Sequence, residues 1–173
     1  MLKTMIDYIQ REKYDNLHTP EYAVKPLLKY LAKTPWVRIW CPCDTEDSNI
    51  VKVLRSSGYT VICSDITTGQ DFFSYEPKGQ YDIIVTNPPY SNKDDFIQRC
   101  YELKKDFALL LPMTAEAGVN RVRMYCQNGI GVIVFDRRVN YTAKNANWFY
   151  SVWLCHWEGV DGKIFFETLR REQ

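Results

Sequence analysis

Residues 81–112 read YDIIVTNPPYSNKDDFIQRCYELKKDFALLLP and carry the clearest fold signal in the chain. Two apolar runs, Tyr81–Thr86 and Phe107–Pro112, flank an amphipathic stretch at Lys93–Lys104. Short apolar runs separated by a helical stretch are typical of buried parallel strands joined by a helix. The sequence therefore predicts a strand–helix–strand unit here.

The same alternation continues in both directions along the chain. Upstream, the pattern predicts a helix over Tyr22–Lys33 after Thr19-Pro20-Glu21, a strand over Trp36–Cys41, a helix over Asn49–Ser56 and a strand over Thr60–Ser64. Downstream, it predicts a helix over Ala115–Gln127 and strands over Gly131–Asp136, Trp148–Trp157 and Lys163–Leu169. Only residues 158–162 separate the last two strands, which is too short for a helical crossover. The predicted fold class is α/β, a mostly parallel sheet with a C-terminal antiparallel hairpin and helices on both faces.

Length and composition narrow the function classes. The chain has 173 residues, which predicts a single domain over 1–173, and 46% of them are hydrophobic, which excludes a disordered chain. Lys and Arg number 22 against 21 Asp and Glu, so any nucleic-acid contact must come from a local patch. No apolar run is long enough for a membrane helix, and the charged start is unlike a signal peptide, so we predict a cytoplasmic protein with no membrane partner.

The six cysteines favour a reducing compartment. Most of them lie inside apolar runs, as expected for buried free thiols. Cys41 and Cys43 form a C-x-C pair, but no second pair stands at zinc-ligand spacing. We therefore predict no metal site.

The tetrapeptide Asn87-Pro88-Pro89-Tyr90 directly follows the strand at 81–86. In open α/β sheets, ligands bind at the carboxyl ends of strands. The two prolines stiffen the loop and force Asn87 into an extended conformation. The Asn87 side-chain oxygen and the Pro88 carbonyl could then accept from a planar –NH2 group while Tyr90 stacks on a flat base. The alternative is that these residues simply end a strand.

With this tetrapeptide, the chain resembles the class I S-adenosylmethionine-dependent methyltransferases that act on exocyclic amines, especially small phage- and prophage-type N6-adenine methyltransferases. The resemblance implies a Rossmann-like methyltransferase fold, S-adenosylmethionine as cofactor, and Asn87, Pro88, Pro89 and Tyr90 as the catalytic residues. It covers most of the chain in the order of the family.

The resemblance also implies cofactor contacts from the Thr-Pro segment near the N-terminus and from the segments that follow the first two strands. The implied cofactor-binding residues are Thr19, Pro20, Pro42, Asp44, Asp47, Asp65, Ile66, Asp71 and Phe72. On their own, the residues leave alternatives open. Asp65 could accept from ribose hydroxyls or cap the following turn. Asp71 could accept from an adenine amino group beside Phe72, or it could lie in a turn while Phe72 and Phe73 pack in the core.

A later segment resembles the part of the family that lies near the target base. It implies that Arg138, Asn140, Tyr141 and Trp148 bind the substrate. Basic and aromatic side chains suit phosphates and a stacked base. The alternative is a solvated loop with a core tryptophan.

The loop after the first strand departs from the family pattern. The family expects Pro-x-x-Gly-x-Gly, whereas residues 42–48 read PCDTEDS, and the first glycine in the chain is Gly58. Asp44 or Thr45 could cap the helix that follows, and Glu46 or Asp47 could suit its positive end or bind the cofactor ammonium. The added negative charge opposes the cofactor carboxylate.

The sequence thus predicts methyl transfer to an exocyclic amine of a nucleic-acid base, adenine N6 in DNA or RNA. The alternatives are a catalytically inactive module that binds nucleic acid or protein, and a protein glutamine N-methyltransferase. The expected partners are DNA or structured RNA, with a second copy of the chain or a partner subunit as further candidates.

Overall fold

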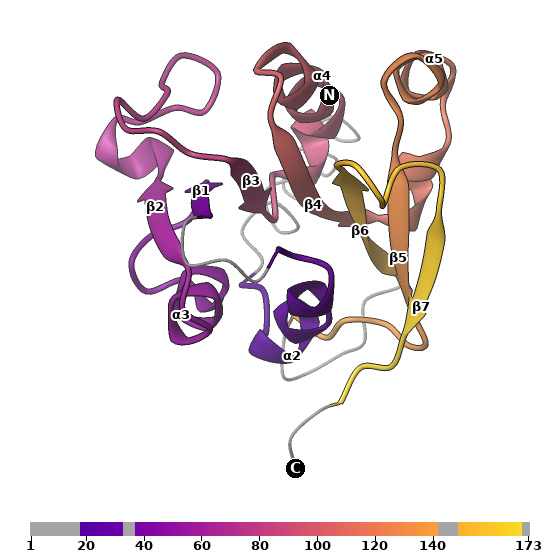
Figure 1. Cartoon of the computed structure of the whole chain (residues 1–173), viewed down its shortest axis with the longest axis horizontal. Coiled ribbons are helices and arrows are strands. Elements are labelled where there is room, and N and C mark those ends of the chain that lie inside the picture. The colour runs from indigo at the N-terminus through magenta and orange to yellow at the C-terminus, as the bar shows by residue number, and fades with distance from the viewer. Residues whose placement is uncertain (1–17, 33–36, 142–148, 171–173) are drawn as a thin grey trace, which may run out of the picture.

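The computed structural model describes residues 18–32, 37–141 and 149–170. These residues build a seven-stranded sheet in the order β2-β1-β3-β4-β6-β5-β7 (Figure 1). The strands are β1 (Arg38–Pro42), β2 (Thr60–Ser64), β3 (Ile83–Thr86), β4 (Asp106–Pro112), β5 (Gly131–Phe135), β6 (Ser151–His156) and β7 (Ile164–Glu167). Only β6 runs against its neighbours; the other six strands are parallel to one another.

Helices cover both faces of this sheet, as expected. α2 (Glu21–Val24), the 3-10 helix η1 (Lys25–Lys29) and α3 (Asn49–Ser56) lie on one face, and α4 (Lys93–Glu102) and α5 (Val119–Asn128) lie on the other (Figure 1). Three short 3-10 helices complete the described elements: η2 (Ile66–Thr68), η3 (Tyr90–Asn92) and η4 (Met113–Glu116). The α/β class with a mainly parallel sheet is confirmed.

Alternating side chains of the buried strands fill two separate core layers. In β1, Ile39 and Cys41 pack with α2 and α3, whereas Trp40 packs on the α4 side. β4 alternates in the same way, with Leu110 on the first face and Leu109 on the second. Continuous apolar runs form these strands because both faces are covered.

The predicted pairing of the last two strands is wrong. β6 pairs antiparallel with β4 and β5, and β7 pairs parallel with β5, so β5 lies between them. Residues 157–163 need to span only two strand spacings, about 10 Å, which needs no helix. They cross the start of β5 at Gly131, where a Cβ atom would lie 2.3 Å from the Val160 carbonyl oxygen.

Two helices have different bounds in the structure from those predicted from the sequence. Pro26 lacks an N–H donor, and the helix predicted over 22–33 is divided into α2 and η1 near it. The helix predicted from Ala115 begins at Val119, after Gly118 at φ 130°. The predicted ends at Lys33 and Trp36 lie outside the described residues.

All six cysteines are free; Cys41, Cys100 and Cys155 are buried, and Cys126 is exposed. Within the described ranges, no helix combines the length and apolar character needed to cross a bilayer.

Candidate functional site

A cleft of about 440 Å³ opens at the carboxyl ends of β1, β2 and β3. β2 lies on one side of β1 and β3 on the other, so the connections that leave β1 and β3 diverge at this point. Such a switch point is where open α/β sheets bind ligands. The cleft is lined by His18, Thr19, Cys43, Asp44, Thr45, Asp47, Ser48, Asn49, Asp65, Ile66, Thr67, Asn87 and Pro89.

Asp44 is a buried carboxyl at the floor of this cleft. It accepts a hydrogen bond from the Ser48 hydroxyl, and its Oδ2 lies 3.0 Å from Thr86 Oγ1. The Thr86 hydroxyl also donates to the Pro42 carbonyl. Because a hydroxyl carries one proton, both Thr86 contacts are hydrogen bonds at once only when Asp44 is protonated.

Burial raises the pKa of Asp44 to about 7, against the opposing effect of the Ser48 and Thr86 hydrogen bonds. The negative charge of Asp65 acts in the same direction as burial. The cleft floor therefore holds a carboxyl that changes its charge near neutral pH.

The other charged side chains of the loop after β1 do not all face the cleft. Cys43 takes the left-handed conformation, at φ 62°, that glycine adopts most readily, whereas the glycine positions of the family pattern fall at Thr45 and Asp47. Glu46 turns away to pair with Arg55, whose guanidinium holds the pKa of that carboxyl at about 2. Asp47 stays 97% exposed beside Lys52 at 3.6 Å, and it lines the cleft.

The expected cap of α3 is not present. α3 begins after Ser48, and no side chain caps it. Asp44 bonds the Ser48 hydroxyl instead of a helix N–H. Asn49 reaches out of the first turn and donates to the Thr19 carbonyl at 2.9 Å, which fixes the N-terminal segment against the cleft.

Asp65 takes the capping role and also lines the cleft. Its Oδ1 accepts from the Thr67 N–H at 2.8 Å and from the Thr67 hydroxyl, at the start of η2. Both bonds use the same oxygen, so the cap occupies one of the two carboxylate oxygens. Ile66, 68% exposed, adds an apolar surface beside it.

Asp71 and Phe72 are not among the described residues that line the cleft. Phe72 is buried, stacks on Phe96 with ring centroids 4.4 Å apart, and contacts Trp40 at 5.4 Å. Asp71 accepts from the Phe73 N–H at 3.1 Å in a turn. The structure thus places Phe72 in the core and Asp71 in a turn, as in the second alternative, whereas Phe73 is 38% exposed.

The tetrapeptide follows β3 and contributes Asn87 and Pro89 to the cleft. Pro88 is buried, and it is not in the cleft lining, nor are Pro20 and Pro42. The Asn87 side chain hydrogen-bonds Tyr90, whose pKa burial raises well above its usual value.

Tyr90 is held by a line of hydroxyl groups. Its hydroxyl lies 2.9 Å from that of Tyr141, which lies 2.8 Å from Ser151 Oγ on β6. Phe149 packs edge-on against the Tyr90 ring at 5.5 Å. These contacts set the orientation of the ring.

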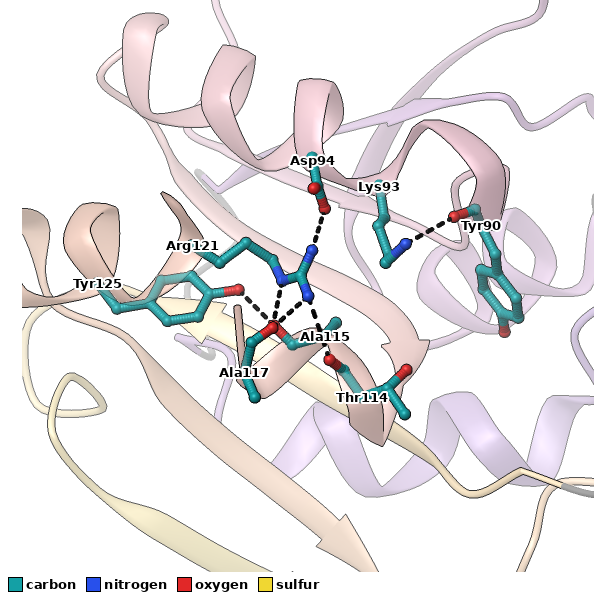
Figure 2. Close-up of polar contacts among 8 residues, drawn as sticks. All are labelled: Tyr90, Lys93, Asp94, Thr114, Ala115, Ala117, Arg121 and Tyr125. Carbon is teal, nitrogen blue, oxygen red and sulfur yellow. Dashed lines mark hydrogen bonds and ion pairs between the residues drawn. The ribbon is translucent and has the colours of Figure 1, made fainter. Parts of the chain in front are cut away.

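The helix after the tetrapeptide is fastened to its neighbours (Figure 2). Lys93 donates to the Tyr90 carbonyl at 3.4 Å, and Asp94 pairs with Arg121 of α5. Arg121 also donates to the carbonyls of Thr114 and Ala117, around η4. The first turn of α4 is thereby tied to η4 and α5.

The residues expected to bind substrate are not in the cleft lining. Tyr141 is buried beneath Tyr90, the Asn140 N–H donates to the Tyr22 hydroxyl at 2.8 Å, and the Arg138 guanidinium lies 5.0 Å from the centre of the Tyr150 ring. Trp148 lies outside the described residues.

Several lining residues were not among the predicted site residues. They are His18, Cys43, Thr45, Ser48, Asn49 and Thr67. All but His18 follow directly on β1 or β2, so their position after a strand could have indicated them. In the described part of the chain, no three or more His, Cys, Asp or Glu side chains gather as metal ligands would.

Two solved structures resemble the fold of this chain. A modification subunit from Vibrio vulnificus YJ016, described as part of a type I restriction enzyme, matches at a TM-score of 0.57 and 10% identity over 99% of this chain and 51% of its own. The type I restriction-modification methyltransferase subunit from Streptococcus thermophilus matches at a TM-score of 0.56 and 13% identity, over 86% of this chain and 45% of its own.

The chain shares its fold with both subunits. The predicted Rossmann-like methyltransferase fold is therefore confirmed. The chain spans about half the length of these two proteins. No protein-family model and no curated protein matches it.

Proposed function

We propose that the chain is an S-adenosylmethionine-dependent methyltransferase that acts on an exocyclic amine of a nucleic-acid base, adenine N6 in DNA or RNA. The observation that carries the proposal is the meeting of Asn87 and Asp65 in one cleft at the switch point of the sheet. An amine-binding tetrapeptide and a ribose-binding acid would have to share such a cleft.

The chemistry of the cleft fits this cofactor. Its lining holds three carboxyl groups, those of Asp44, Asp47 and Asp65, and no lysine or arginine among the described lining residues. Asp65 would accept from the ribose hydroxyls, and Asp47 would face the ammonium. The cofactor, when bound, supplies a methyl group activated on a positively charged sulfonium.

The tetrapeptide would orient the target amine. The Asn87 side-chain oxygen and the Pro88 carbonyl would accept hydrogen bonds from its two N–H groups, which draws the nitrogen lone pair out of conjugation with the base. The ring of Tyr90, fixed through Tyr141, would support the flat base. Catalysis would rest on positioning and polarisation.

Labelled-methyl transfer to DNA, RNA and protein tests this role. Asn87→Ala should lower the transfer rate by about 100-fold, because one of the two oriented acceptors is lost. Asn92→Ala, on the exposed end of η3, is the matched control and should keep the rate. An undiminished rate in Asn87→Ala would exclude the mechanism.

A second candidate is a catalytically inactive module that binds nucleic acid or protein. The loop at 43–48 favours it, because its carboxyl groups oppose the cofactor carboxylate and glycine is absent. Calorimetric titration with S-adenosylmethionine and its demethylated product separates the two. In the titration, dissociation constants beyond the millimolar range favour the binding module. In the labelled-methyl transfer assay, label in protein alone favours glutamine methylation.

We propose a nucleic acid as the first partner of the chain and another protein subunit as the second. Both solved relatives in fold are subunits of restriction-modification systems by their descriptions. We further propose a cytoplasmic location and a single domain, as the sequence predicts.

A further inference from the structure

The outer edge of β7 is a surface that the proposed function does not use. β7 pairs with β5 on one side, and no described strand pairs with its other side, at the right-hand rim of the sheet in Figure 1. Ile164 and Phe166 are 64% and 78% exposed. An apolar edge with unpaired main-chain groups is a template for another strand.

The pairing with β5 shows which main-chain groups point outward. Val132 and Asp136 donate to the carbonyls of Lys163 and Glu167, so the odd-numbered residues of this segment turn toward β5. Main-chain groups alternate along a strand. Those of Ile164 and Phe166 therefore point away from the sheet.

We propose that β7 pairs antiparallel with β7 of a second copy of this chain, about a two-fold axis at Phe165. In this register Ile164 lies opposite the partner's Phe166, and their outward N–H and C=O groups form the hydrogen-bonded pairs. The symmetry repeats each pair, so the interface is isologous. The proposal stands independently of any catalytic activity.

The side chains favour a second copy over an unrelated strand. Lys163 falls opposite the partner's Glu167, but that carboxylate already pairs with Lys29 and accepts from Tyr30 of its own copy, so the apolar side chains decide the pairing. Ile164 and Phe166 stand beside Val132 and Val134 of β5, so the pairing continues an apolar row across the axis. Sliding the register by two residues would place Phe166 opposite either itself or the partner's Gly162.

Sedimentation equilibrium gives the first test. The protein should form a reversible dimer of twice its 20.4 kDa mass. Ile164→Pro removes an outward N–H only and should raise the dimer dissociation constant at least about tenfold. Val119→Pro is the control, since it changes an exposed valine at the first position of α5, where proline is tolerated. A monomer at all concentrations would overturn the proposal.

Disulfide crosslinking tests the register, in a Cys126→Ser background that removes the exposed thiol. Phe165→Cys should crosslink to itself, because residues facing at the axis have Cα atoms about 4.5 Å apart. Thr168→Cys should stay uncrosslinked. The Ile164→Cys and Phe166→Cys variants should each crosslink poorly alone and well when the two proteins are mixed. Because both positions are exposed, this pair keeps the test valid if Phe165→Cys folds poorly. A dimer in which Thr168→Cys crosslinks and the Phe165, Ile164 and Phe166 variants do not would place the interface elsewhere.

Discussion

Asp44 is the residue whose charge state most affects the cleft. Its carboxyl is buried between β1 and β3, and its contacts with Thr86 are best satisfied in the protonated form. Burial raises its pKa to about 7 in the folded protein. The folded state therefore holds this proton more tightly than the unfolded state does.

Asp44→Asn should remove this pH dependence. Between about pH 4 and pH 7 the folded wild type binds more protons than the unfolded chain, so its stability falls as the pH rises. An amide at this position can accept from Ser48 and donate to Thr86 without carrying charge. Raising the pKa from 3.8 to about 7 destabilises the charged form, so we expect the variant to be more stable by about 4 kcal/mol at pH 8 and close to wild type near pH 4.

Urea unfolding of both proteins across this range gives the measurement. The difference between the two curves isolates Asp44 from other titrating groups. Parallel curves would mean that Asp44 does not titrate in this window.

Tyr141 illustrates how a residue can serve a site without lining it. The resemblance implied a contact with the target base, whereas the structure buries Tyr141 and uses its hydroxyl to join Tyr90 and Ser151. Its role in the proposed reaction is therefore to position the Tyr90 ring.

Tyr141→Phe should lower kcat about tenfold, because the ring of Tyr90 loses its fixed orientation. Loss of the hydroxyl should also cost about 1 kcal/mol of unfolding free energy. Affinity for the cofactor should not change, since Tyr141 is away from the cleft lining. Tyr150→Phe, at an exposed ring, is the control. A change in cofactor affinity with kcat intact would contradict a positioning role.

At the scale of elements, the local signals located the strands and helices well. The predicted bounds of α3 and β2 agree with the structure residue by residue. Apolar periodicity and flanking turn residues are local properties, so they can be recognised in the sequence. Pairing depends on what lies between two strands in space. The short connection at 158–162 suggested a hairpin, which the position of β5 between β6 and β7 excludes.

For the candidate site too, features set by local sequence were predictable, and those that depend on packing were not. Thr19, Asp65 and Asn87 meet in the cleft because each lies next to the carboxyl end of a strand or to the loop that follows one. Phe72 does not meet them, because an aromatic residue in an apolar stretch has the same local pattern in the core and beside a ligand.

At Gly131, the connection from β6 to β7, which the sequence suggested was a hairpin, crosses the start of β5. An added Cβ would lie 2.3 Å from the Val160 carbonyl oxygen, and main chain cannot yield as a flexible side chain does. Gly131→Ala should therefore destabilise the fold by about 2–3 kcal/mol in urea unfolding. Gly79→Ala, where the nearest atom is 3.8 Å from the added carbon, should change stability by less than about 0.5 kcal/mol. Equal stabilities would show that the connection does not pack on Gly131.

For the whole molecule, two core layers and one sheet hold the loops of the cleft. β3 is buried along its length between β1 and β4, so the tetrapeptide begins from a rigid support. The cleft carboxyls and the β7 edge lie at different parts of the sheet, several strands apart. A change at one of these surfaces should therefore leave the other intact.

The common direction of six strands has a consequence for any pair of molecules joined through β7. An antiparallel β7 pair would reverse the strand direction at the interface, and the twist of the sheet would accumulate from there to each cleft. Nine strand spacings, about 43 Å, would separate the two copies of β3. Two clefts that far apart would not share one small substrate, so each copy would have to bind its own.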